Sequence, residues 1–151
     1  MTFDAVLAIL HHLAAFALTG LLVAELVLLR GQQDGASIKR FGLVDAFYGA
    51  TAGFVVLAGI GRLLFGAVPV EFYLGNAFFW IKMAALGTVA GISLLPTIQG
   101  IRWRRVLATD PAYAPTVTEL SHVRRALLVQ LAVLPLIPIS AALMARGIGA
   151  L

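Results

Sequence analysis

The stretch that decides the fold is AVLAILHHLAAFALTGLLVAELVLL, residues 5–29. A helix crosses the hydrocarbon core of a bilayer with about 20 consecutive apolar residues, and this stretch is long enough to do so. Three ionisable side chains interrupt it, those of His11, His12 and Glu25. The sequence therefore opens with a membrane-spanning helix that carries polar groups inside it.

Three further apolar stretches follow, at residues 43–66, 77–99 and 119–146. Of the 151 residues, 61% are hydrophobic and 12% are charged, whereas a soluble domain averages about 45–50% apolar and 25% charged residues. Four spans with short connections use most of the chain and leave no room for a soluble domain. The sequence predicts one all-α domain over residues 1–151, a transmembrane four-helix bundle whose first partner is the lipid bilayer.

Local signals set the expected ends and bends of these helices. Gly31 and Asp34 end the first span in a polar turn, and the sequence TVTE at 116–119 has the spacing of a capping box that starts the fourth helix. Pro135 and Pro138 should kink that helix, which membrane helices tolerate. Between the third and fourth helices, residues 100–121 place Trp103 among arginines, which predicts a segment lying on the membrane surface.

The cations predict the orientation of the chain. Eight of the 11 Lys and Arg residues lie in the connections after the first and third spans or at the start of the fourth: Arg30, Lys39, Arg40, Arg102, Arg104, Arg105, Arg124 and Arg125. Because cytoplasmic loops are enriched in Lys and Arg, these connections should be cytoplasmic and both termini periplasmic. We expect a multi-pass protein of the bacterial inner membrane that binds no nucleic acid and, lacking a basic N-terminal region, keeps its first helix.

Several chemistries find no support in the sequence. The chain has no cysteine, which excludes disulfides, thiolate metal sites and cysteine nucleophiles. No hydrolase, kinase or nucleotide-binding motif is present.

Ionisable residues inside a span are costly and usually mark function. The predicted topology brings four of them to the periplasmic side of the bundle: His11, His12, Arg62 and Lys82. Glu25 is about 40° from His11 on a helical wheel and His12 is about 100° from His11. If Glu25 faces the interior, so does His11, and adjacent histidines cannot both reach one metal. The sequence leaves open which one would ligate.

Each of these residues also has a purely structural interpretation. The histidines could bind water or lipid headgroups at the interface, and Lys82 and Arg62 could extend toward the surface. Their functional interpretation is metal ligation or proton transfer for the histidines, and anion or propionate binding for the cations. At the cytoplasmic side, Glu25 and Asp45 are expected to form structural ion pairs with Arg124 and Arg125.

The sequence resembles an uncharacterised family of short four-helix bacterial membrane proteins, over nearly the whole chain. This family is similar to the HemJ-type protoporphyrinogen oxidases and to the CopD-like copper-resistance membrane proteins. The resemblance is carried by five motifs: HHLAAF at 11–16, DAFYG at 45–49, GIGR at 59–62, FWIK at 79–82 and SLLPT at 93–97.

In the HemJ type, a histidine of the first helix and a lysine of the third carry heme binding and activity. The resemblance implies that His11 or His12 is the axial metal ligand and that Lys82 is the catalytic residue. Independently of the resemblance, the two carboxylates of a heme favour cations beside them, which makes Arg62 and Lys82 the expected propionate-binding residues. The doubled histidine and Glu25 differ from the HemJ pattern, so the implied property is heme b binding rather than porphyrinogen oxidation.

Three functions remain open from the sequence. The first is a heme b membrane oxidoreductase or electron carrier that exchanges electrons with a redox partner or a quinone. The second is a transporter that passes copper or protons from the histidines toward Glu25 and Asp45. The third is a structural or accessory subunit. A homodimer is one arrangement that would enclose a large cofactor, because four short helices offer little surface.

Overall fold

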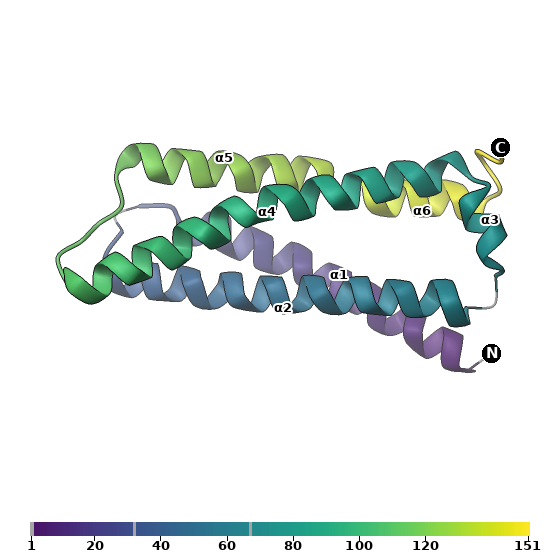
Figure 1. Ribbon diagram of the computed structural model, residues 1–151, viewed down its shortest axis with the longest axis horizontal. Coiled ribbons are helices and arrows are strands. Elements are labelled where there is room, and N and C mark those ends of the chain that lie inside the picture. The colour runs from purple at the N-terminus through teal and green to yellow at the C-terminus, as the bar shows by residue number, and fades with distance from the viewer. Residues whose placement is uncertain (1, 32, 67) are drawn as a thin grey trace.

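The computed structural model describes residues 2–31, 33–66 and 68–151, and these residues form helices and no strands. Figure 1 shows a long bundle in which both termini lie at the same end as a short helix. The helices are α1 (Thr2–Leu28), α2 (Gly35–Phe65), α3 (Val70–Leu74), α4 (Ala77–Thr109), α5 (Val117–Val133) and α6 (Leu136–Ala145). We call the end that holds α3 and the termini the α3 end, and the opposite end the α4–α5 end.

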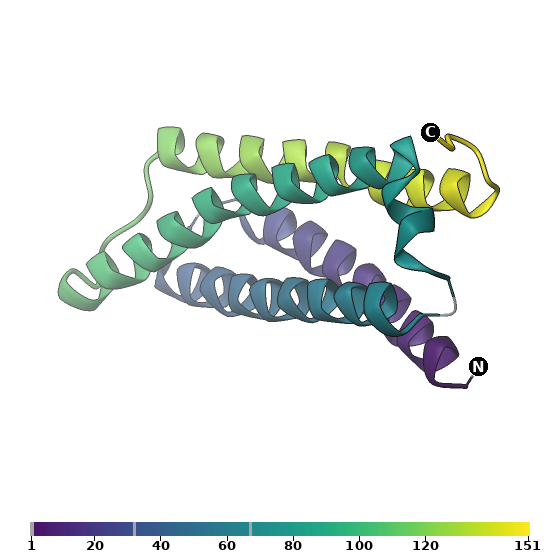
Figure 2. The same cartoon turned by 45° about the vertical axis from the view of Figure 1, so that its right-hand side comes forward.

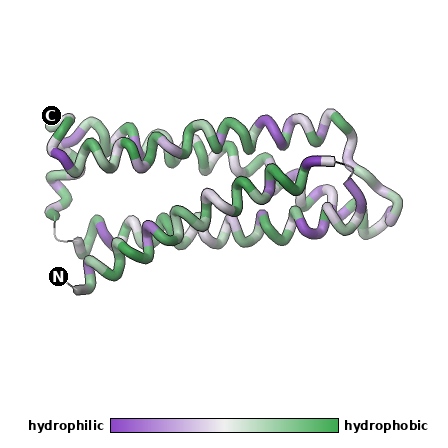
Figure 3. Tube along the Cα trace, turned by 180° about the vertical axis from the view of Figure 1, so that it is seen from behind, coloured by the Kyte–Doolittle hydropathy of each residue, from purple (hydrophilic) through white to green (hydrophobic). Residues whose placement is uncertain are grey.

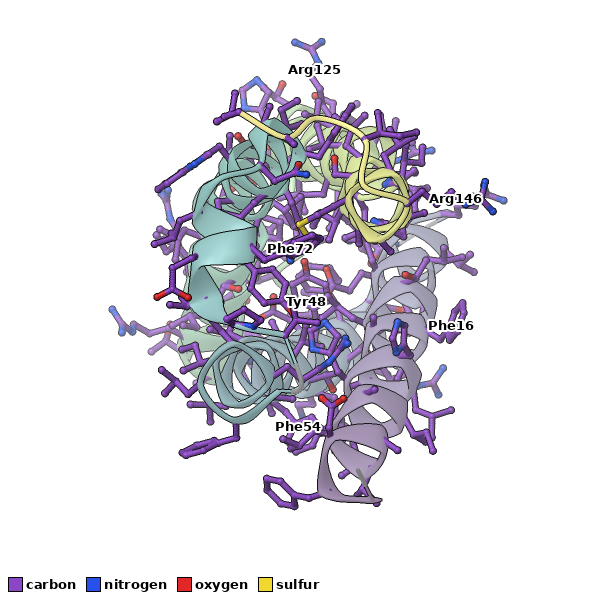
Figure 4. The ribbon with its side chains drawn as sticks, turned by 90° about the vertical axis from the view of Figure 1, so that its right-hand side faces the viewer. Phe16, Tyr48, Phe54, Phe72, Arg125 and Arg146 are labelled. Atoms are coloured by element: carbon purple, nitrogen blue, oxygen red, sulfur yellow. The ribbon has the colours of Figure 1, made fainter. Side chains whose placement is uncertain are left out.

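Four segments are long and apolar enough to cross a membrane: Phe3–Leu28, Gly35–Phe65, Ala77–Thr109 and Val117–Ala145. Large apolar side chains cover the outside of the bundle, as Phe16 (76% exposed) and Phe54 (45% exposed) illustrate by pointing away from it (Figure 4). Along the chain, hydrophobic residues dominate the middle of the helices, and hydrophilic ones are sparse there (Figure 3). The predicted all-α transmembrane four-helix bundle is confirmed.

The tightly packed core lies in the half of the bundle near the α4–α5 end. There α1 packs against α2 and α5, while α2 also packs against α4. Toward the α3 end, the pair α1–α2 diverges from the pair α4–α6 (Figures 1 and 2). The core cluster contains Leu18, Leu22, Leu29, Ile38, Phe41, Tyr48, Trp103, Leu107, Val123 and Leu127.

The second helix begins eight residues before the apolar stretch that starts at residue 43. α2 begins at Gly35 because Asp34 caps it: the Asp34 carboxylate accepts a hydrogen bond of 2.7 Å from the backbone N–H of Ser37. An N-cap carboxylate of this kind satisfies a backbone donor that the helix leaves unpaired. The same bond holds the pKa of Asp34 below its usual value.

The expected membrane-surface segment at residues 100–121 is wrong in its first half. Residues 100–109 continue α4, which ends at the C-cap Asp110. Trp103 is 1% exposed and packs on Phe41 with 5.7 Å between ring centroids, so it is a core residue. Gly100 permits this packing, because a Cβ there would lie 3.0 Å from the Phe41 ring. The glycine marks close helix contact rather than a helix end.

The fourth span agrees with the sequence in its start and in its interruption. Thr116 and Glu119 form the predicted capping box at the start of α5. The span is broken between Val133 and Leu136, where Pro135 lacks the N–H that would continue the helix. The proline bend divides the span into α5 and α6.

At the α3 end, the C-terminal residues pair with the connection between α3 and α4. Asn76 caps α4 through its side-chain oxygen and donates from Nδ2 to the carbonyl of Ile148. Backbone bonds from Ala77 to Gly149 (2.8 Å) and from Leu151 to Gly75 (2.9 Å) complete the seam.

Replacing Trp103 by Ala should lower the free energy of unfolding by about 3–5 kcal/mol, because it empties a buried volume between α2 and α4. The matched variant Trp80→Ala should cost much less, since Trp80 is 53% exposed. Denaturant unfolding in mild detergent measures both. Equal losses for the two variants would contradict the position of Trp103 in the core.

Candidate functional site

The two histidines of α1 point in different directions, as the helical wheel predicts. Glu25 is buried at 1% exposure, and His11 on the same face is half-buried, whereas His12 is exposed on the outer surface. The two imidazole rings are nearly perpendicular, with 86° between their planes. His11 faces the bundle and His12 faces away from it.

His11 is held against α2. Its Nδ1 lies 3.0 Å from the carbonyl oxygen of Val55, and a Cβ at Gly59 would lie 3.3 Å from its Cε1. A carbonyl only accepts hydrogen bonds, so Nδ1 must carry the proton in this contact. A neutral ring in this tautomer keeps the Nε2 lone pair free for a ligand or a proton.

Two cations accompany His11 on the inside of the α3 half. Arg62 of α2 and Lys82 of α4 lie close enough to His11 for their positive charges to act on it, and the charge of Arg62 also acts on Lys82. Both side chains are half-buried, and Lys82 Nζ lies 5.4 Å from the centre of the Phe79 ring. We call His11, Arg62 and Lys82 the cationic cluster.

The cationic cluster contains a buried hydrogen-bond donor that an anion would satisfy. Arg62 Nε is buried and has no hydrogen-bond partner among the residues that the structure describes. A buried guanidinium N–H without an acceptor is costly. The cluster can therefore accept a carboxylate or another anion, with His11 Nε2 available beside it.

The predicted ion pairs of Glu25 and Asp45 with Arg124 and Arg125 are wrong. Glu25 and Asp45 are buried, whereas Arg124 and Arg125 are exposed, and Arg125 points away from the bundle (Figure 4). The wheel position of these arginines places them outside, where water or headgroups solvate them. His122 is also exposed and lines a surface groove with Arg125, so it joins neither cluster.

A second polar cluster occupies the interior, and sequence reasoning found only its acids. Tyr48 donates a hydrogen bond of 3.0 Å to Gln130 Oε1, and Thr97 donates one of 2.8 Å to Asp45 Oδ1. Glu25 lies within coulombic range of both Asp45 and Tyr48. We call these five residues the carboxyl cluster. The signal that the sequence offered for this cluster was Gln130, a polar side chain within the otherwise apolar residues 126–139.

Neither cluster brings together three side chains of the kinds that usually hold a metal ion. Across residues 2–31, 33–66 and 68–151, no three His, Cys, Asp or Glu side chains gather closely enough to hold one. A cofactor that brings its own equatorial ligands needs only one or two axial groups from the protein, and the cationic cluster offers one in His11.

The family of the chain follows from its sequence as a whole. The model of a family described as predicted membrane proteins, DUF2214, matches residues 3–149. The chain belongs to this family. Comparisons with curated proteins and with solved structures give no match. The family description agrees with the four spans, and it assigns no chemistry to the two clusters.

The bond between Tyr48 and Gln130 should stabilise the bundle. Tyr48→Phe removes the donor to Gln130 Oε1 and leaves the buried Gln130 carboxamide without a hydrogen-bond partner among the described residues, which should cost about 1–3 kcal/mol. Tyr73→Phe, in the half-buried position on α3, is the matched control and should change stability by less. Thermal unfolding in detergent compares them, and an unchanged midpoint for Tyr48→Phe would argue against the buried bond.

Proposed function

We propose that this membrane protein binds heme b inside the α3 half of the bundle and acts as a membrane oxidoreductase or electron carrier. The observation that carries the proposal is the contact between His11 Nδ1 and the Val55 carbonyl oxygen, at 3.0 Å. Axial histidines are oriented by such a second hydrogen bond, which fixes the tautomer and leaves Nε2 to the iron. His11 is therefore the proposed axial ligand, in preference to His12.

The charges of the site support the same proposal. Heme b is an apolar disc that carries two carboxylates, and the cationic cluster supplies Arg62 and Lys82 for two anionic groups. The unpartnered Arg62 Nε is a donor that a propionate would satisfy. Glycine at position 59 keeps the α2 surface flat beside the imidazole of His11.

The bound heme would supply a one-electron couple, and the residues of the chain would set the conditions for it. His11 would hold the heme through Nε2, and Arg62 would neutralise an anionic group of the heme in a medium where an unpaired charge is costly. Lys82, whose Nζ lies 5.4 Å from the centre of the Phe79 ring, is the proposed catalytic residue, because its amine can carry a proton to or from a small substrate. A quinone or a redox protein would be the electron partner.

The chemistry favours this function over the alternatives of copper transport and of a purely structural subunit. A site that held copper by protein groups alone would need three or more ligands close together, and no three His, Cys, Asp or Glu side chains gather so among the described residues. A structural subunit would not require a buried guanidinium nitrogen without an acceptor. A homodimer would add the surface of a second copy at the α3 end, where the helix pairs diverge (Figures 1 and 2).

Spectra test the ligand. Purified wild-type protein from heme-replete cells should show a Soret band and, after reduction with dithionite, the α and β bands of a b-type heme. His11→Ala should abolish these bands, because it removes the iron-binding nitrogen, and the neighbouring variant His12→Ala should retain them. Colourless wild-type protein would overturn the proposal, and loss of the bands only in His12→Ala would transfer the ligand to that residue.

The same proposal includes the bacterial inner membrane, with the α3 end and both termini in the periplasm. The excess of Lys and Arg at the α4–α5 end supports this orientation.

The cysteine-free chain allows a direct test of orientation. A membrane-impermeant maleimide applied to intact spheroplasts should label Glu71→Cys on α3 and should label Ala114→Cys, in the α4–α5 connection, only after the membrane is permeabilised. Both replaced side chains are exposed, so access depends on the side of the membrane. The reverse labelling pattern would place the termini in the cytoplasm.

A further inference from the structure

The carboxyl cluster is separate from the cationic cluster and has no role in the heme proposal. Its members come from four helices: Glu25 from α1, Asp45 and Tyr48 from α2, Thr97 from α4 and Gln130 from α5. Glu25 is 1% exposed and Gln130 is completely buried. Thr97 is twelve residues before Thr109, the last residue of α4, about 18 Å along the helix. On α4, the cluster therefore lies about three turns inside the α4–α5 end.

Two atoms of the cluster are buried without a partner among the described side chains and backbone: Glu25 Oε1 and Gln130 Nε2. The Gln130 carboxamide uses its oxygen to accept from Tyr48, so its N–H groups remain. An ionised carboxylate in this setting would lack hydrogen bonds and solvent, and such a group takes up a proton instead.

The charges around the two acids leave one of them uncompensated. Arg104 of α4 is the cation that acts on Asp45, and its side chain runs over Gly42, where a Cβ would lie 2.8 Å from the Arg104 Nε. From α1 and α2 the ionisable groups that face Glu25 are Asp45 and Tyr48, and α5 contributes the neutral Gln130. Two carboxyls and one arginine are neutral only when one proton is added.

The two acids differ in how well an anion is supported. Asp45 receives a hydrogen bond from Thr97 and the charge of Arg104. Glu25 Oε1 receives no such support within the described part of the chain. The added proton therefore belongs on Glu25, with Asp45 ionised.

We propose that Glu25 and Asp45 form a proton-binding site inside the membrane that holds one exchangeable proton, on Glu25, at neutral pH. Arg104 lies on the side of the pair nearest the α4–α5 end, so this end is the route by which the proton exchanges with water. The Tyr48–Gln130 pair lines the opposite side of the site. The proposal is independent of whether heme is bound.

Infrared difference spectroscopy of the protein in liposomes tests this directly. A protonated buried carboxyl gives a C=O stretching band that shifts in D2O and disappears when the acid ionises. Wild-type protein should show this band at neutral pH, and Glu25→Gln should lose it. Glu71→Gln, the same substitution at an exposed position on α3, should leave the band unchanged.

Asp45→Asn gives a second, graded outcome. Removing the neighbouring negative charge while Arg104 remains makes ionisation of Glu25 easier, so the band should persist at low pH and disappear at a lower pH than in wild type. Because glutamine has the shape of the protonated acid, Glu25→Gln should fold, and its thermal unfolding midpoint checks this.

Two results would overturn the proposal. One is the absence of a Glu25-dependent carboxyl band in wild-type protein at neutral pH. The other is loss of the band when sodium replaces choline at constant pH, because the site would then bind a metal cation in place of the proton. Neither result bears on the heme spectra, which are recorded separately.

Discussion

The contact between α2 and α4 at Phe41, Gly100 and Trp103 is the interaction on which the rest of the bundle depends. In lipid, helices gain nothing from burying apolar surface against each other, so close packing must hold them together. Gly100 lets the Phe41 ring approach α4, and Trp103 covers it one turn later. This anchor lies in the core half of the bundle, and the buried acids lie beside it, while the opposite half is free to diverge.

The existence and number of the spans could be predicted from the sequence, because the length and apolar character of a membrane helix are set by the bilayer. The ends of the helices could not. Residues 100–109 are rich in arginine, which suggests a surface segment, yet α4 continues through them because Trp103 finds a partner on α2. At Asp34, the capping hydrogen bond to Ser37 extends α2 beyond its apolar run. Tertiary contact and local capping decided what hydropathy left open.

For the polar residues, helical periodicity was enough to orient side chains on one helix and insufficient to pair them across helices. The wheel related His11 to Glu25 and separated His12, as the structure has it. It did not reveal that Gln130 would meet Tyr48, nor that Arg125 would point outward (Figure 4). Such pairings depend on the rotation of each helix about its axis, which a single sequence does not encode in any local pattern.

The hydrogen bonds between the C-terminal residues and the α3–α4 connection close the second half of the chain into a loop. Asn76 bonds to Ile148, and Leu151 bonds to Gly75, so the chain from α4 through α6 returns to its own starting point. A pull on the last residue would load these hydrogen bonds before it reached α6. A protein fused directly after Leu151 would lie next to these hydrogen bonds and would strain them. A spacer between the two proteins would leave the bonds intact.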